Sequence, residues 1–247
     1  MDGMAQGHGW EGAVLKLFRG KDFVFTVTGA EQVTEHFRRL HLTDGGMLAA
    51  TGVHPTMWVR LWFDNAGKPH QRAYTLVDPD PEAGTFSLEF ALHEGCASDW
   101  ARAAAPGDTI EATVQGTGFQ RPAPEPSHVF AIGDPASLPA LNSLVDEVGS
   151  APATIWFETD HGTEGLPLRT DPERHELRTV PRLGSGAHLV SQVRDAMPEL
   201  LKDRDPAGIY VWIAADTATT RSLAAYFRKE LQVPKQRVSA LGYWRET

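Results

Sequence analysis

The feature that most restricts the fold of this chain is a change of pattern near its middle. Strand-like segments rich in Val, Thr and aromatic residues follow one another from Phe23 to about Glu111, separated by turn sequences such as NAGKP, DPDPEAG and PGD. Several short strands at this spacing predict an antiparallel barrel or sandwich. A short helix over 97–105 is expected to interrupt them.

After the Pro-rich sequence RPAPEPS at 121–127, strands and helices alternate. The buried-strand runs HVFAIG, ATIWFET and GIYVWIAAD are each followed by a helical segment, and the sequence RVSALGYW adds a last strand. Such alternation predicts a parallel sheet with crossover helices. The sequence therefore predicts two domains, an antiparallel β-barrel over 1–126 and an α/β domain over 127–247.

Composition excludes several classes of function. The formal net charge of −9 argues against nucleic acid or an anionic membrane as a partner. The single cysteine, Cys96, excludes an intramolecular disulfide and a Cys-ligated iron–sulfur cluster, and the ten histidines show no metal-ligand spacing. The N-terminus lacks the pattern of a signal peptide, and no apolar run is long enough to span a membrane. We therefore expect a soluble, cytoplasmic protein without a metal site of its own.

The sequence HQRAYTLVD carries the first candidate site. Arg72, Tyr74 and Thr75 lie within four residues of one predicted strand. They can provide a guanidinium for a phosphate, a ring against an isoalloxazine face and a hydroxyl near the polar edge of a flavin. The spacing suits one large, flat, anionic cofactor. The alternative is that these side chains only form the exposed face of a barrel strand.

The sequence CASDWARAA predicts a helix that begins among small residues. The start of such a helix offers unpaired backbone N–H groups and the positive end of the helix dipole to a pyrophosphate. Ala97 would let a phosphate approach closely, and Ser98 could add a hydroxyl donor. Alternatively, Ser98 only caps the helix.

The second half has no G-x-G-x-x-G fingerprint. Instead, Gly133, Asp134 and Ser137 lie where the first predicted parallel strand meets its helix, at the edge where open α/β sheets bind ligands. Asp216 begins a comparable strand-to-helix turn. The alternative is that both turns are ordinary helix caps.

The second strand of this domain ends on acidic residues, Glu158 and Asp160. An acidic side chain there can accept hydrogen bonds from a ribose 2′-hydroxyl and repel a 2′-phosphate, which favours NADH over NADPH. Arg169 and Arg174, which follow in a predicted loop, could reach back and reverse this preference.

Four sequences together resemble the siderophore-interacting protein family: R-x-Y-T, the run H…A-S-x-W…P-G-D, IGDPASLPAL and the terminal ALGYWRET. Members are flavin-dependent ferric-siderophore reductases related to the ferredoxin-reductase fold. The resemblance spans nearly the whole chain and is weakest at 1–20 and 160–185. The sequence HEGCASDW departs from the family pattern, because it is shorter and has Glu94 where glycine is usual.

The resemblance implies a two-domain ferredoxin-reductase-like fold, with FAD in the barrel domain and NADH or NADPH in the α/β domain. Electrons would pass from NAD(P)H or ferredoxin through FAD to a ferric siderophore and release Fe(II), with no catalytic acid, base or nucleophile required. Resemblance also places His93 beside the flavin, the nicotinamide nucleotide near Gly133 and Asp216, Trp244 by the flavin, and Arg245 in the substrate cleft. A lone histidine is more often structural, and Trp244 and Arg245 could be only a strand end and a surface charge.

Two other functions remain open at this point. The protein could be an NAD(P)H:flavin or ferredoxin-type reductase that acts on another acceptor. It could also be a non-catalytic protein that binds or senses a chelate.

Overall fold

The computed structural model of the chain describes residues 20–114 and 118–245. Contacts between Cα atoms divide the chain into two compact units, one ending at Phe119 and the other beginning at Gln120, whereas the sequence places the boundary at 126/127. None of the helices among the described residues is long and apolar enough to cross a membrane. The N-terminal sequence considered for a signal peptide lies outside the described residues.

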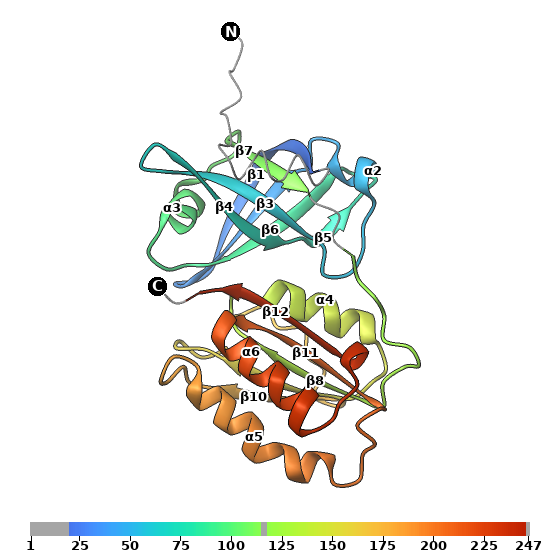
Figure 1. Cartoon of the computed structure of the whole chain (residues 1–247). Helices are drawn as coiled ribbons and strands as arrows, with labels where there is room; N and C mark the ends of the chain where they lie inside the picture. Colours follow the sequence, from blue (N-terminus) through green and yellow to red (C-terminus); the bar gives the residue numbers. More distant parts are fainter. Residues whose placement is uncertain (1–19, 115–117, 246–247) are drawn as a thin grey trace. The chain divides into compact units, whose positions relative to one another are not determined.

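The first unit is an antiparallel sheet that curls into a half-barrel (Figure 1). Its seven strands are arranged in the order β4-β3-β7-β1-β2-β6-β5. The described residues of this unit also form two helices. The strands are β1 (Lys21–Thr34), β2 (Phe37–Thr43), β3 (Trp58–Asn65), β4 (Lys68–Thr75), β5 (Val77–Asp80), β6 (Thr85–Ala91) and β7 (Thr109–Val114), and the helices are α2 (Met47–Thr51) and α3 (Cys96–Ala103).

A tight hairpin sets the register of the strand that carries the first candidate site. Asn65 pairs with Lys68, and the two residues between them, Ala66 and Gly67, have φ angles of 53° and 78°. Positive φ at both central positions is the type I′ turn, whose twist suits a two-residue hairpin. The Oδ1 atom of Asp64 accepts the N–H of Gly67 at 3.0 Å and supports the turn.

The second unit is a five-stranded parallel sheet in the order β10-β9-β8-β11-β12. All residues of the three central strands are buried, as expected for strands covered on both faces. The strands are β8 (His128–Gly133), β9 (Ala153–Glu158), β10 (His175–Val180), β11 (Ile209–Asp216) and β12 (Val238–Trp244), and the helices are α4 (Leu138–Val148), α5 (Ala187–Leu201) and α6 (Thr217–Ala225).

Right-handed crossovers place the helices of this unit. The chain moves outward from β8 to β9 through α4, and returns to β11 and β12 through α5 and α6. The connection through α4 runs across the sheet in one direction, and the connections through α5 and α6 run in the other. Because crossovers of the same hand that run in opposite directions place their helices on opposite faces, α5 and α6 cover one face of the sheet and α4 covers the other (Figure 1). Leu189, Val193 and Leu223 accordingly pack into one apolar cluster with Phe130 and Ile213 of the sheet.

The predicted antiparallel β domain and parallel α/β domain are confirmed, with three differences in detail. The first unit contains α2, a helix that the sequence did not predict. The segment 160–185, expected to be a loop, contains the edge strand β10. The last predicted helix ends as α-helix at Ala225 and continues as one π-helical stretch, Tyr226–Glu230.

Candidate functional site

In the first unit, the residues expected to hold a flavin lie at the end of β4. Arg72 is exposed, and its Nη1 donates a hydrogen bond to the carbonyl oxygen of Gln71 at 2.9 Å. Tyr74 is half-buried, and alternation along the strand puts its side chain on the same face as that of Arg72. Thr75 is buried, at 5% exposure, and lies on the other face. The structure thus brings Arg72 and Tyr74 together and turns Thr75 away from them.

An aromatic cluster connects Tyr74 to the helix that follows β6. The Tyr74 ring centroid lies 4.4 Å from that of Phe90 and 6.2 Å from that of Phe63. Both phenylalanines also contact Trp100 of α3, at 6.0 and 5.8 Å. Burial raises the pKa of the Tyr74 hydroxyl, and the smaller effect of Arg72 lowers it. The phenol therefore keeps its proton and stays available as a hydrogen-bond donor.

The start of α3 lies beside this cluster. Cys96, the first residue of α3, packs against the same apolar core as Tyr74. Gly95, the N-cap residue of α3, has φ 136° and carries no side chain that could cap the helix. Ser98 is 2% exposed, and its Oγ accepts the backbone N–H of His93 at 3.1 Å, so its hydroxyl braces the loop before the helix.

Sequence reasoning missed Arg102 in this region. Its Nη2 donates to the carbonyl oxygen of His93 at 3.2 Å, and its Nη1 pairs with Asp99 at 3.1 Å. The only signal in the sequence was the i,i+3 spacing to Asp99, which indicates a surface ion pair and nothing about the loop.

These residues fit a flavin dinucleotide. The uncapped start of α3 can receive a pyrophosphate, and Ala97, which is buried in its first turn, adds no bulk there. Arg72 supplies a guanidinium exposed to solvent, and Tyr74 supplies an aromatic edge fixed by its neighbours. The guanidinium can form charge-assisted hydrogen bonds with a phosphate of such a cofactor.

In the second unit, the turn after β8 is closed by reciprocal hydrogen bonds. The Oγ of Ser137 accepts the N–H of Asp134 at 2.9 Å, and the Oδ1 of Asp134 accepts the N–H of Ser137 at 3.0 Å. A Cβ atom on Gly133 would lie 2.6 Å from the Ser137 Oγ, so a larger residue at this position would displace that hydroxyl. Gly133, Asp134 and Ser137 therefore belong to one tight turn at the carboxyl end of β8.

Asp216 and Glu158 end the neighbouring strands, and both are buried. The Oδ1 of Asp216 accepts the N–H groups of Ala218 and Thr219 at 2.9 and 3.1 Å, which is the capping role that the sequence left open. Its Oδ2 lies 3.7 Å from the Nη1 of Arg182. The same Nη1 donates a hydrogen bond to Glu158, whose side chain is 1% exposed.

Arg182 also contacts Trp244, the last residue of β12. The guanidinium carbon of Arg182 lies 4.6 Å from the centroid of the indole ring. The indole Nε1–H donates to the Oδ2 of Asp134 at 2.7 Å. The next residue, Arg245, is exposed. Sequence reasoning missed Arg182, because it follows β10, which was not recognised as a strand.

Burial is the largest influence on the pKa values of two carboxylates at this sheet edge, Asp134 and Glu158. It raises the pKa of Asp134 to about 6, although the hydrogen bonds from Trp244 and Ser137 act in the opposite direction. It also raises the pKa of Glu158, against the smaller opposing effect of Arg182. No group of three or more His, Cys, Asp or Glu side chains is placed to hold a metal ion anywhere in residues 20–114 and 118–245.

The residues invoked for the choice of nucleotide lie in different surroundings. Glu158 is occupied by Arg182 and has little exposed surface, whereas Asp160 is exposed. Arg169 and Arg174 form ion pairs with nearby aspartates at 2.7 and 2.8 Å. Of the two acidic residues, Asp160 is thus the one whose carboxylate is open to a ribose.

Two family profiles match this chain. One, described as siderophore-interacting protein, matches residues 126–247. The other, described as siderophore-interacting FAD-binding domain, matches residues 52–116 and so includes β4, β6 and α3.

Curated relatives are similar along most of this chain. The mycobactin import ATP-binding/permease protein IrtA of Mycolicibacterium thermoresistibile is 33% identical over 96% of this chain and 26% of its own length. The chain thus spans about a quarter of the length of that relative. The ferric acinetobactin reductase of Acinetobacter baumannii is 26% identical over 78% of this chain and 67% of its own length.

Solved structures share the fold. A siderophore-interacting protein from Acinetobacter baumannii superposes with a TM-score of 0.77 at 21% identity, covering 92% of this chain and 91% of that one. A ferredoxin NADP+ reductase from Neisseria gonorrhoeae, solved with bound FAD and NADP, gives a TM-score of 0.67 at 15% identity, covering 91% and 99%. The ferredoxin-reductase-like fold is therefore confirmed.

Proposed function

Because this chain belongs to the siderophore-interacting protein family, we propose that it is an FAD-dependent reductase of ferric siderophores. The observation that carries the proposal is the surface formed by Arg72, Tyr74 and the uncapped start of α3. It lies within the segment that the FAD-binding profile matches. A relative named for the reduction of ferric acinetobactin supports the same substrate class.

Electron counting supports the need for a flavin. A nicotinamide nucleotide gives up two electrons as a hydride, whereas each ferric chelate accepts one, so one NADH reduces two chelates. Bound FAD would supply the exchange between two-electron and one-electron steps. Oxygen-rich chelators bind Fe(III) more tightly than Fe(II), so reduction would release the iron.

The residues of the chain have holding and orienting roles in this proposal. Arg72 would bind phosphate, and Tyr74 would contact the ring system from its fixed place against Phe90. His93, Ala97 and Ser98 would shape the loop and helix start around the pyrophosphate.

The second unit would bind the electron donor at the carboxyl edge of its sheet. Gly133, Asp134 and Ser137 would form the floor of that site beside the Asp216 turn, and Trp244 would lie at its edge. We propose NADH as the donor, with NADPH or ferredoxin as alternatives, because Asp160 remains open to a ribose while the nearby arginines are paired. Arg245 would meet an anionic chelate.

The test begins with the purified protein and its visible spectrum. We expect a yellow protein whose flavin is bleached by NADH under argon faster than by NADPH, and is then reoxidised by a ferric siderophore with the appearance of Fe(II). Bleaching without reoxidation by ferric chelates, followed by reoxidation with quinones, would show a reductase with another acceptor. Absence of bound or bindable flavin would overturn the proposal.

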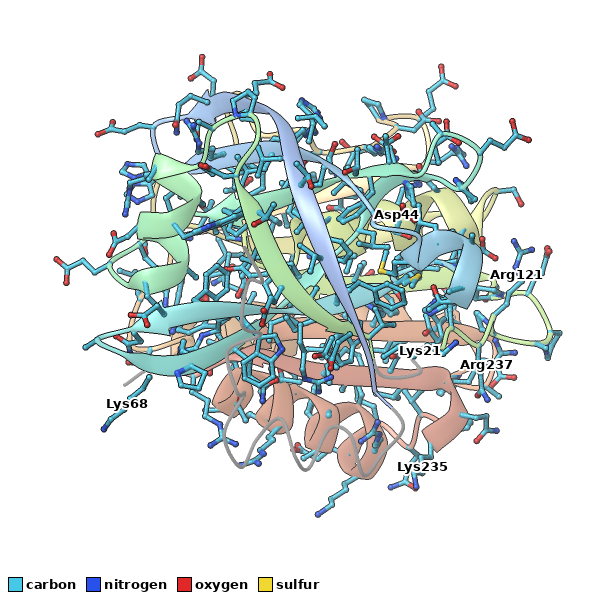
Figure 2. The ribbon with its side chains drawn as sticks, turned by 90° about the horizontal axis from the view of Figure 1, so that it is seen from above. Lys21, Asp44, Lys68, Arg121, Lys235 and Arg237 are labelled. Atoms are coloured by element: carbon cyan, nitrogen blue, oxygen red, sulfur yellow. The ribbon has the colours of Figure 1, made fainter. Side chains whose placement is uncertain are left out.

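A pair of variants tests the flavin site itself. Arg72→Ala removes a charge-assisted phosphate contact and should weaken FAD binding about tenfold to a hundredfold. The control is Lys68→Ala, because Lys68 is exposed on the same strand and projects from the outer end of the β3–β4 hairpin (Figure 2). Titration of apoprotein with FAD measures both affinities. Equal affinity of Arg72→Ala and wild type would show that the phosphate lies elsewhere.

A further inference from the structure

The carboxyl edge of the parallel sheet carries one polar side chain from each of its five strands. Arg182 follows β10 and Trp244 ends β12, which are the two outer strands. Their side chains nevertheless meet, with the guanidinium carbon 4.6 Å from the indole centroid. The three strands between them contribute the carboxylates of Glu158, Asp134 and Asp216.

Arg182 is the only cation among these five residues. Its side chain is 15% exposed, and the carboxylates of Glu158 and Asp216 that it contacts are 1% and 4% exposed. Buried carboxylates that face one guanidinium hold it firmly, because moving it would leave them unpaired in a medium of low polarity. The two carboxylates therefore restrain the guanidinium of Arg182.

The shape of the guanidinium gives it a second partner. A planar guanidinium binds carboxylates through its edge and leaves its face free to stack on an aromatic ring. In this structure Nη1 of the Arg182 guanidinium donates to Glu158, and the guanidinium carbon lies over the ring of Trp244. A lysine ammonium has no such face, so it could keep the ion pair but not the stacking.

We propose that Arg182 is a positioning residue for Trp244. It holds the indole so that Nε1–H remains on the Oδ2 of Asp134, and so fixes the end of the last strand, from which Arg245 follows. Its effect on electron transfer rests on the function proposed above. Its effect on Trp244 does not, and is measured separately.

The experiment uses the full chain labelled with 5-fluorotryptophan, whose seven tryptophans give separate fluorine NMR signals. Trp244→Phe identifies the signal of residue 244. Arg182→Lys should shift or broaden that signal and leave most of the others in place. If Arg182→Lys does not fold, Glu158→Gln gives the same test, because it removes a carboxylate that fixes the guanidinium.

The chain offers a matched control in Arg178→Lys. Arg178 lies over Trp156 at 5.3 Å and forms an ion pair with Glu176 at 2.8 Å, in the same unit. This variant should change the signal of Trp156 and not that of Trp244. An unchanged Trp244 signal in a folded Arg182→Lys protein, or an equal change in both variants, would overturn the proposal.

The pH dependence of the Trp244 fluorine signal is a second measurement. It tests whether Arg182 acts on Trp244 itself or only stabilises the fold. Glu158 interacts electrostatically with both Asp134 and Asp216, and Arg182 contacts Glu158 and Asp216. The hydrogen bonds to the Asp134 carboxylate come from Trp244, Ser137 and the backbone of Ala136. The wild-type Trp244 signal should move near pH 6 as Asp134 gains its proton, and Asp134→Asn should abolish that step. In Arg182→Lys the amplitude of the step should fall. A wild-type signal that does not move between pH 5 and pH 7 would contradict the contact with Asp134.

The consequence for catalysis is measured last. If the protein is the proposed reductase, Arg182→Lys should slow reduction of its bound flavin by NADH about tenfold, with unchanged flavin content, and Arg178→Lys should not. Failure of the wild type to react with NADH would count against the proposed function and leave the NMR result standing. A shifted Trp244 signal with an unchanged rate would refute the catalytic consequence alone.

Discussion

At the scale of single residues, the ionisation of Asp134 makes the stability of the protein depend on pH. Burial raises its pKa to about 6, from an ordinary value of 3.8. Between these values the folded protein binds more protons at this site than the unfolded chain does. The free energy of unfolding should therefore fall as pH rises through this window, by up to about 1.4 kcal/mol per pH unit from this group.

Replacing Asp134 by asparagine removes this titration. Between about pH 4 and pH 6 we expect the stability of Asp134→Asn relative to wild type to rise with pH, because the variant lacks the decline that Asp134 contributes. Buried His128, whose pKa is lowered to about 4, acts in the opposite direction but is present in both proteins. Its stability at one fixed pH is a poorer guide, because an asparagine cannot accept from both Ser137 N–H and Trp244 Nε1–H. Urea unfolding at a series of pH values measures the slope, with Asp160→Asn as the exposed control. Equal slopes in wild type and Asp134→Asn would place the titration on another group.

Sequence reasoning at this scale found residue types better than it found their partners. It selected Asp134 and Trp244 separately, one as a turn residue and one through resemblance. Their hydrogen bond joins positions 110 residues apart, which no local pattern could indicate. Glu158 was interpreted as a ribose acceptor, because the residues next to it in the sequence do not indicate that Arg182, 24 residues later, pairs with it.

At the scale of elements, the turn before α5 depends on glycine. Gly186 has φ 85°, and a Cβ atom there would overlap the Thr219 side chain and lie 3.2 Å from the Oδ2 of Asp216. The start of α5 thus approaches the start of α6 through a position without a side chain. This contact holds the loop that carries Arg182 close to Asp216.

Gly186→Ala should destabilise the protein by more than the backbone conformation alone explains. A left-handed conformation costs a residue with a side chain about 1–3 kcal/mol, and the overlap with Thr219 should add to it. Gly184→Ala is the matched control, because Gly184 is also left-handed, at φ 59°, but its Cβ would meet only Ala187 at 3.5 Å. Urea denaturation of both variants gives the comparison. A loss in Gly184→Ala as large as that in Gly186→Ala would count against the overlap.

Most elements could be predicted because their patterns are local. The central strands are largely apolar runs, and a glycine, Gly149, follows the end of α4. β10 was not predicted because it is an edge strand in which only His175 and Val180 are buried. Its sequence, HELRTV, therefore has only a weak apolar pattern. The π-helical end of the last helix could not be foreseen, because its residues are compatible with an ordinary helix.

At the scale of the whole molecule, the formal charge of −9 opposes the binding of an anionic chelate. Local positive charge must then offset this field, and the exposed Arg245 at the end of β12 is the proposed source. Arg245→Glu should raise the KM for an anionic ferric chelate about tenfold, as loss of one charged contact would. High salt should partly reproduce the effect in wild type.

The control for this charge reversal is Arg221→Glu, at an exposed position of α6. It changes the net charge by the same amount and should leave the KM nearly unchanged. Steady-state Fe(II) release at low and high salt measures both variants. A similar rise in both would assign the effect to total charge, and no rise in either would assign chelate binding to another part of the surface.

The meeting of five strand ends at one edge has a consequence for mutational scanning. Arg182, Glu158, Asp134, Asp216 and Trp244 share partners, so removing any one changes the surroundings of the others. The effects of single substitutions here should therefore not be additive, and their sum would count the same interaction more than once. Double-mutant cycles are the appropriate measure, and they should give large coupling energies between positions that no stretch of sequence connects.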